Sequence, residues 1–214
     1  MLCRIAIDGP GGAGKSTVAK ILAKDLNIDY VDTGAMYRAI GLKLLRSGIT
    51  IEEGPELEEM LASTDIDFVE GKILLDGEDV SDLIRTPEVS MAASNCSALG
   101  PVRKKLVALQ KAMGLRKNLV MDGRDIGTNV MPNAEYKFYI TASAEERAKR
   151  RYLELKGKGE DADYEKVLEE INQRDYNDMH RDLDPLKRAD DAVLVDTTEM
   201  DIETVVANIK KMIK

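Results

Sequence analysis

Short apolar runs alternate with amphipathic segments along most of the chain. The apolar runs predict strands at residues 3–7, 30–31, 119–121, 136–140 and 192–195, of which 30–31 is the weakest. Apolar positions at helical spacing predict helices at residues 15–26, 34–46, 56–62, 87–99, 101–113, 144–155, 164–181 and 202–212. This alternation is typical of an α/β fold with a parallel sheet, although the periodicity leaves the strand order open.

Two segments depart from the alternation. Residues 66–80 switch between apolar and polar positions, with turns near 70–72 and 76–78, and this pattern predicts a small antiparallel insertion. Residues 156–159 read Lys-Gly-Lys-Gly, which predicts a flexible connection between two charged helices.

The composition argues against several classes of function. The chain has 214 residues and a net charge of −8, unlike a nucleic-acid binder that works by bulk electrostatics. Cys3 and Cys96 form no disulfide framework, so a cytoplasmic protein is expected. His180 is the single histidine, which makes a zinc site of usual composition unexpected. No apolar run reaches the roughly 20 residues of a membrane helix, so no membrane partner is expected.

The strongest chemical signal is a glycine-rich loop after the first predicted strand. Residues 9–17 match the phosphate-binding pattern G-x-x-x-x-G-K-[ST], in which backbone N–H groups and a helix start bind phosphate oxygens. The expected nucleotide-binding residues are Gly9, Pro10, Gly11, Gly12, Ala13, Gly14, Lys15, Ser16 and Thr17. Lys15 would reach the β- and γ-phosphates, and the Ser16 hydroxyl would bind Mg²⁺.

The same loop also fits a dinucleotide-binding pattern. Gly9, Gly11 and Gly14 satisfy G-x-G-x-x-G, and Asp32 falls roughly where such a fold keeps its ribose-binding acid. Lys15 favours the triphosphate interpretation, because a dinucleotide fold does not need that lysine.

Further candidate residues lie at strand ends and on the later helices. Residues 32–38 place a hydroxyl, a glycine and Arg38 at a helix start, which suits an anion or a plainly capped helix. Asp122 would orient Mg²⁺ and Arg124 would hold a phosphate at the end of an apolar strand. The arginines of the two charged helices suit either phosphoryl transfer or ion pairs with neighbouring carboxylates. These are Arg147, Arg150, Arg151, Arg174 and Arg181, with Asp178 on the same face as the last two.

Five segments together resemble the bacterial cytidylate kinases: GPGGAGKST, DTGAMYR, DGRDIGT, SAEERAKRR and QRDYNDMHR. The resemblance covers nearly the whole chain, including an insertion at about 66–85. It implies one P-loop nucleoside monophosphate kinase domain over 1–214, with a five-stranded parallel sheet, flanking helices, a small antiparallel insertion and a short lid. The implied core is 1–32, 101–148 and 182–214, the monophosphate-binding region is about 33–100, and the lid is about 149–181.

The resemblance also implies a reaction, namely ATP-dependent phosphorylation of CMP and dCMP with Mg²⁺. Its motifs assign the acceptor phosphate to Arg38 and Arg124, the cytosine to Thr33, Arg103, Asp125 and Arg181, and the sugar to Ser94, Arg174 and Asp178. They place Arg147 and Arg151 near ATP. The expected catalytic residues are Lys15, Arg124, Arg151 and Arg174. We expect a monomer with no nucleic-acid partner.

The chemistry of the acceptor separates this interpretation from its rivals. Asp125 would accept a hydrogen bond from the cytosine amine, whereas uracil would present a carbonyl and leave two acceptors facing each other. A kinase for a sugar or a shikimate-like hydroxyl is the nearest alternative, with Asp32 or Asp125 as its base. A GTPase-like switch is disfavoured because the chain has no N-K-x-D motif.

Overall fold

The computed structural model describes residues 3–69 and 71–213. The chain folds as two compact units, one formed by residues up to Tyr30 together with those from Lys117 onward, the other by Val31–Arg116. We call these the core unit and the inserted unit. Residues 101–116, which the sequence analysis assigned to the core, make their contacts within the inserted unit. The functional division into core, acceptor region and lid remains a prediction.

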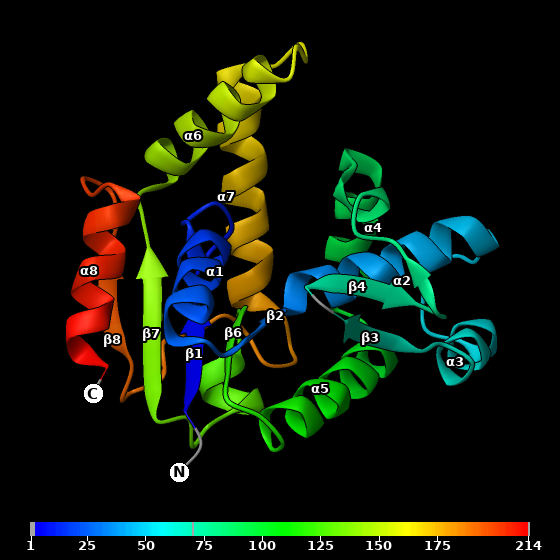
Figure 1. The fold of residues 1–214 in the computed structure, drawn as a ribbon. Coiled ribbons are helices and arrows are strands. Elements are labelled where there is room, and N and C mark those ends of the chain that lie inside the picture. The colour runs from blue at the N-terminus through cyan, green and yellow to red at the C-terminus, as the bar shows by residue number, and fades with distance from the viewer. Residues whose placement is uncertain (1–2, 70, 214) are drawn as a thin grey trace. The chain divides into compact units, whose positions relative to one another are not determined.

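A five-stranded sheet organises the core unit, as Figure 1 shows. Its strands are β1 (Arg4–Asp8), β2 (Asp29–Asp32), β6 (Leu119–Gly123), β7 (Tyr136–Thr141) and β8 (Val193–Asp196). The order is β2-β6-β1-β7-β8, and β1 pairs in parallel with both β6 and β7. The predicted parallel α/β fold is therefore confirmed, and the strand predicted weakly at 30–31 is a full member of the sheet. The phosphate-binding loop leaves the carboxyl end of the central strand, where open α/β sheets bind ligands.

The main hydrophobic core lies between this sheet and helices α1 (Lys15–Leu26) and α8 (Ile202–Met212). Ile5 and Ile7 of β1 point into it beside Val18 and Leu22 of α1, and all four side chains are fully buried. Val18 and Leu22 are one helical turn apart, so the predicted apolar stripe of α1 faces the strand that precedes it. This packing fixes the start of α1, and with it the end of the glycine-rich loop.

Helices α6 (Ala144–Gly157) and α7 (Tyr164–His180) run alongside each other in the core unit (Figure 1). Each begins with a side-chain cap: Ser143 accepts from the Glu146 N–H at 3.1 Å, and Asp163 accepts from the Lys166 N–H at 3.0 Å. Two sequence expectations change here. The first is the flexible connection predicted at 156–159, of which residues 156–157 are helical and only the rest forms a turn. The Glu160 N–H donates to the Leu155 carbonyl at 3.1 Å and so terminates the helix.

The second change is at the other end of the pair. Helix α7 ends at His180, one residue before the predicted end, because Arg181 is extended with φ −66° and ψ 146°.

The periodicity missed one element that adjoins the candidate site. Residues Ile126–Val130 form a single π-helical turn, η2, directly after Asp125. Its wide spacing is visible in the Val130 N–H, which donates to the carbonyl of Asp125 at 3.1 Å, five residues back. Such turns are rare and are frequently found at functional sites.

The inserted unit combines helices with the predicted antiparallel sheet. Its elements are α2 (Thr33–Ser47), α3 (Pro55–Ala62), β3 (Ile66–Val69), β4 (Lys72–Leu75), β5 (Glu78–Asp79), η1 (Leu83–Arg85), α4 (Pro87–Cys96) and α5 (Gly100–Gly114). β3, β4 and β5 pair antiparallel in that order, which confirms the insertion. Asp76 and Gly77 form the predicted second turn, both with positive φ, whereas Glu70 of the first turn lies outside the described residues.

Helix α4 ends at Cys96, three residues before the predicted end at 99. The following residues, Ser97 to Leu99, instead lead into α5, whose first helical residue is Gly100. Among the described residues, no helix is long and apolar enough to cross a membrane.

Candidate active site

The glycine-rich loop has the backbone geometry that the motif predicts. Gly9 adopts φ 143°, and a Cβ there would lie 1.9 Å from the carbonyl oxygen of Ile140 on β7, so only glycine fits. Gly14 adopts φ 87° at the start of α1, and no side chain caps that helix. No side chain therefore occupies the first N–H groups of α1. These groups and the partial positive charge of the helix N-terminus form the arrangement that binds phosphate oxygens.

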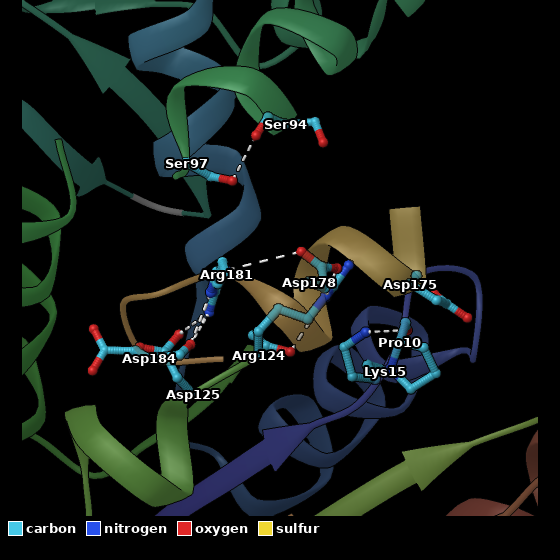
Figure 2. Close-up of polar contacts among 12 residues, drawn as sticks. Pro10, Lys15, Ser94, Ser97, Arg124, Asp125, Asp175, Asp178, Arg181 and Asp184 are labelled. Atoms are coloured by element: carbon cyan, nitrogen blue, oxygen red, sulfur yellow. Dashed lines mark hydrogen bonds and ion pairs between the residues drawn. The ribbon is translucent and has the colours of Figure 1, made fainter. Parts of the chain in front are cut away.

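Lys15 follows this turn and is buried against the loop. Its Nζ donates to the Pro10 carbonyl at 2.7 Å (Figure 2). Burial, together with the positive charge of Arg124, lowers the pKa of Lys15 from 10.5 to about 7, against the opposing effect of the Asp122 carboxylate. A phosphate group at the loop would supply the missing negative charge, so this lysine is placed to take up a triphosphate.

Asp122, at the end of β6, links the loop to a neighbouring strand. Its Oδ2 accepts from the Ser16 hydroxyl at 2.8 Å, and its Oδ1 accepts from the Tyr30 hydroxyl, also at 2.8 Å. The carboxylate is 4% exposed. A hydroxyl and a carboxylate are the oxygen ligands that Mg²⁺ uses at phosphate sites, where phosphates and waters complete the shell. Ser16 and Asp122 thus fit the predicted metal, and no cluster of three acidic, histidine or cysteine ligands occurs within residues 3–69 and 71–213.

Two arginines lie beside the loop at Gly11. A Cβ on Gly11 would lie 3.4 Å from Arg124 Nη2 and 3.8 Å from Arg174 Cδ. Arg124 Nε donates to Asp178 Oδ2 at 2.7 Å, which joins the end of β6 to α7 (Figure 2). Burial would lower the pKa of Arg124, but the charge and hydrogen bond of Asp178 raise it above its ordinary value. Burial acts the opposite way on Asp178, yet Arg124 brings the pKa of that carboxyl below its ordinary value.

Arg147 joins α6 to the same loop. It is 4% exposed, and its Nη1 donates to the Gly11 carbonyl at 3.1 Å. Asp175 of α7 accepts from both terminal nitrogens, at 3.1 and 2.6 Å. Arg151, one turn further along α6, pairs with Glu154 at 3.0 Å instead of contacting the loop.

Asp125 and Arg181 form a second cluster in the core unit, shown in Figure 2. Arg181 Nη2 lies 3.4 Å from Asp125 Oδ1, and Arg181 Nε donates to the Asp184 carbonyl at 2.8 Å. Asp125 Oδ2 also accepts from the Asn129 side chain at 3.3 Å. A carboxylate held between a guanidinium and an amide is suited to reading the polar edge of a base.

The remaining predicted residues belong to the inserted unit. Asp32 caps α2 through the Ala35 N–H at 2.8 Å, and its other oxygen pairs with Arg38 at 3.1 Å. Arg38 Nε is buried without a hydrogen-bond partner among the described residues. A buried guanidinium N–H of this kind carries a desolvation cost that an anionic ligand would remove.

Three further predicted residues, Thr33, Ser94 and Arg103, also belong to this unit. Arg103 is buried, with its guanidinium 6.0 Å from the centre of the Tyr37 ring. The Ser94 carbonyl accepts from the Ser97 hydroxyl at 2.8 Å, and Thr33 is buried as the first residue of α2. Asp32 is committed to the cap and to Arg38, which argues against its service as a general base.

Comparison with known proteins identifies the family. The family model described as cytidylate kinase matches residues 5–214. The cytidylate kinase of Caldicellulosiruptor bescii is 52% identical over 97% of this chain and 94% of its own length. That of Carboxydothermus hydrogenoformans is 52% identical over 98% of this chain and 96% of its own length. The chain belongs to the cytidylate kinase family. It is therefore a kinase, and the family implies ATP as donor and a nucleoside monophosphate as acceptor.

Solved structures agree on the fold of this cytidylate kinase family member. A shikimate kinase from Bacteroides thetaiotaomicron has a TM-score of 0.53 at 14% identity, covering 99% of this chain and 98% of its own. An uncharacterised protein from Eubacterium ventriosum has a TM-score of 0.57 at 15% identity, covering 100% and 98%. At such identities the likeness concerns the arrangement of strands and helices only.

Sequence reasoning missed several residues that support the family's site. Tyr30, Asp175 and Asp8 each bind a predicted site residue or the turn beside it. Tyr30 lies in the segment that the sequence predicts only as a weak strand, and Asp175 is one of many acidic residues on a charged helix, so neither stands out in the sequence.

Proposed function

We propose that the protein is a monomeric enzyme that transfers the γ-phosphoryl group of ATP, with Mg²⁺, to CMP and dCMP, giving CDP and dCDP. The observation that carries this proposal is the convergence of Lys15, Arg124 and Arg147 on one glycine-rich loop. Positive charge at this density beside a buried loop is what a transferring phosphoryl group requires.

The acceptor chemistry explains why the site needs no general base. The second pKa of a phosphate monoester is about 6, so the attacking oxygen of a nucleoside monophosphate is already ionised at neutral pH. His180 is exposed and stacks on Tyr176 at 4.1 Å between ring centres, in keeping with a role outside the chemistry. Positioning and charge stabilisation then account for the rate.

The carboxylates of α7 hold the arginines in place before nucleotide binds. Asp178 and Asp175 keep the guanidinium groups of Arg124 and Arg147 aimed at the loop, with both pairs almost buried. Pre-organised cations need little reorganisation when the phosphates arrive, which is the main source of electrostatic catalysis. Arg174 would join Arg124 at the transferring group, and Arg151 would join after a movement of the lid, proposed at about 149–181.

Mg²⁺ would be held by Ser16, with Asp122 orienting its shell, and when bound would neutralise charge between the β- and γ-phosphates. Tyr30 fixes the second oxygen of Asp122, so the carboxylate has one orientation toward Ser16.

Each unit carries residues that the family resemblance assigns to the acceptor. In the core unit Asp125 would accept the exocyclic amine of cytosine, beside Arg181. In the inserted unit Arg38 would bind the acceptor phosphate, while Thr33, Ser94 and Arg103 would contact the nucleoside. Closure of the region at about 33–100 would exclude water and suppress ATP hydrolysis.

An acceptor panel tests the proposal. Purified protein is incubated with ATP and Mg²⁺ and with CMP, dCMP, UMP, AMP or GMP, and the diphosphate products are separated by chromatography. We expect CDP and dCDP to form with the highest kcat/KM. Preference for a purine monophosphate, or for a sugar or shikimate added in parallel, would contradict the assignment.

A further inference from the structure

Asp8 is a buried carboxylate that the mechanism above does not use. It is the last residue of β1, directly before the glycine-rich loop, and is 4% exposed. Its Oδ1 accepts from the Ile126 N–H at 2.8 Å, and its Oδ2 accepts from the Gly127 N–H at 2.7 Å. A buried carboxylate is costly unless such partners are present, so both bonds matter to the position of the group.

The two N–H groups that bind Asp8 open the π-helical turn η2. The first N–H groups of a helical turn have no partner within it, and Asp125, at the N-cap position, makes no side-chain cap. Asp8 therefore caps the turn from a strand 118 residues away in sequence. With both N–H groups held, the peptide that follows Asp125 has a fixed orientation.

Gly127 makes this close approach possible. A Cβ at this position would lie 3.2 Å from Asp8 Oδ2 and 3.3 Å from Lys137 Cδ. Both distances are tighter than ordinary van der Waals contact, so a side chain at this position requires the carboxylate, Lys137 or the turn to shift by a few tenths of an ångström. The lack of a side chain at Gly127 therefore allows its N–H to reach the buried Asp8 carboxylate.

Asp125 is tied to the same turn at its other end. Its carbonyl accepts from the N–H groups of Asn129 and Val130, at 2.9 and 3.1 Å, and its side chain accepts from Asn129. Both the backbone and the carboxylate of Asp125 thus depend on the position of η2. Asp8 controls that position without being one of the groups assigned to the nucleotide.

We propose that Asp8 is a positioning residue for acceptor selection, holding the turn Ile126–Gly127 so that Asp125 presents its carboxylate to the acceptor base. The inference rests on the proposed function, since it requires a base that Asp125 reads. Asp8 also directly precedes Gly9, but its side-chain oxygens bind the turn and not the phosphate-binding loop.

The first test measures kcat/KM for CMP and for UMP at saturating MgATP in the Asp8→Asn variant. The asparagine amide would face one of the two backbone N–H donors, so one bond is lost and the turn shifts. We expect the CMP/UMP ratio to fall about tenfold, mainly through a higher KM for CMP, with the KM for ATP changed by less than about twofold. Equal losses for CMP and UMP would overturn the proposal and leave Asp8 a structural residue.

Two companion variants keep the test decisive. Gly127→Ala strains the same turn without removing a charge, and should lower the CMP/UMP ratio in the same direction; it decides the question if Asp8→Asn fails to fold. Asp191→Asn is the matched control, because Asp191 pairs with Lys137 on the other side of Gly127, at 2.7 Å, and is exposed. Its ratio should equal that of the wild type, and a drop as large as that of Asp8→Asn would overturn the proposal.

A double-mutant cycle shows whether Asp8 acts through Asp125. In an Asp125→Asn background, Asp8→Asn should change the CMP/UMP ratio by less than about twofold, because the group that it positions is already altered. A full additional tenfold change would contradict the proposal. If the wild-type enzyme prefers CMP and these variants leave the CMP/UMP ratio unchanged, this inference alone is refuted. If the wild-type enzyme does not prefer CMP, the proposed function is refuted as well.

Discussion

Charged side chains are held differently in the two units of the chain. In the core unit, Arg124 and Arg147 are paired with carboxylates of α7 at 2.7 and 2.6 Å, and each also lies at the glycine-rich loop. In the inserted unit, Arg38 has one carboxylate partner, at 3.1 Å, and its buried Nε has no partner among the described residues. The core unit thus holds its cations in position, while Arg38 keeps binding capacity for a ligand.

This difference predicts two classes of mutational effect. A group locked in place before substrate binds contributes most to the transition state, so its loss lowers kcat. A group that is completed by the ligand contributes to binding in the ground state as well, so its loss raises KM. The first two of the four predictions below test this division directly, and the other two concern the core unit alone.

Lys15→Ala should have the largest effect. We expect kcat/KM to fall by at least about 3 kcal/mol in transition-state terms, with the loss mainly in kcat, because the lysine beside the transferring phosphoryl group is removed. Arg124→Ala should behave in the same way. Steady-state kinetics measure the loss, and circular dichroism should show an intact fold. Lys24→Ala, an exposed lysine on the same helix, is the control. Near-wild-type turnover in Lys15→Ala would refute its role.

Arg38→Ala should come next, and its effect should appear in the acceptor. We expect the KM for CMP to rise about a hundredfold, while the KM for MgATP stays within about twofold. The control is Arg46→Ala. Arg46 is an exposed arginine on the same helix as Arg38, and it pairs with Glu78. If Arg38→Ala lowered kcat without changing the KM for CMP, the division between the units would be wrong.

Asp125→Ala should have a smaller effect, on selectivity. The CMP/UMP ratio of kcat/KM should fall about tenfold, more than the best rate falls, because the acceptor for the cytosine amine is lost. Competition between CMP and UMP in one reaction measures the ratio directly. An unchanged ratio would remove Asp125 from base recognition.

The smallest expected effect concerns pH and stability. Burial, which outweighs the two backbone N–H groups and is assisted by the charge of Asp125 and opposed by Lys15, raises the pKa of Asp8 from 3.8 to about 6. The folded state then binds a proton more tightly than the unfolded state, so the stabilising contribution is full at low pH and is lost as pH rises through 6. Wild type relative to Asp8→Asn should be more stable at pH 5 than at pH 7 by about 1 kcal/mol.

Chemical unfolding of both proteins at the two pH values measures this difference. If wild type and Asp8→Asn differ in the free energy of unfolding by the same amount at pH 5 and at pH 7, the pKa of Asp8 is not raised and the prediction is wrong.

The sequence was most informative where the backbone carries the chemistry. The loop at residues 9–17 could be predicted because Lys15 and Ser16 follow its glycines at the spacing of a triphosphate site, and the parallel sheet followed from the alternation of strands and helices. The order of the strands was left open, since periodicity does not report which strands are neighbours. The antiparallel insertion could be predicted because Asp76 and Gly77 are typical turn residues.

The supporting contacts were beyond sequence reasoning because they join residues far apart in the chain. Tyr30 meets Asp122, Arg147 meets Asp175, and Asp8 meets η2, each through a side-chain geometry that no spacing rule contains. The π-helical turn itself has no periodic signature over five residues. Assignments such as Ser94 and Arg103 came from the family resemblance, and their contacts with a nucleotide remain predictions.

The central claim is that the paired arginines and the glycine-rich loop serve transfer to a pyrimidine monophosphate rather than hydrolysis. The most direct measurement follows ADP release by the wild-type protein with MgATP, with and without CMP, while CDP is quantified in the same samples. We predict one CDP for each ADP, and a rate without CMP that is lower by at least about a hundredfold. ADP release that is independent of CMP, or that exceeds CDP formation, would contradict the claim.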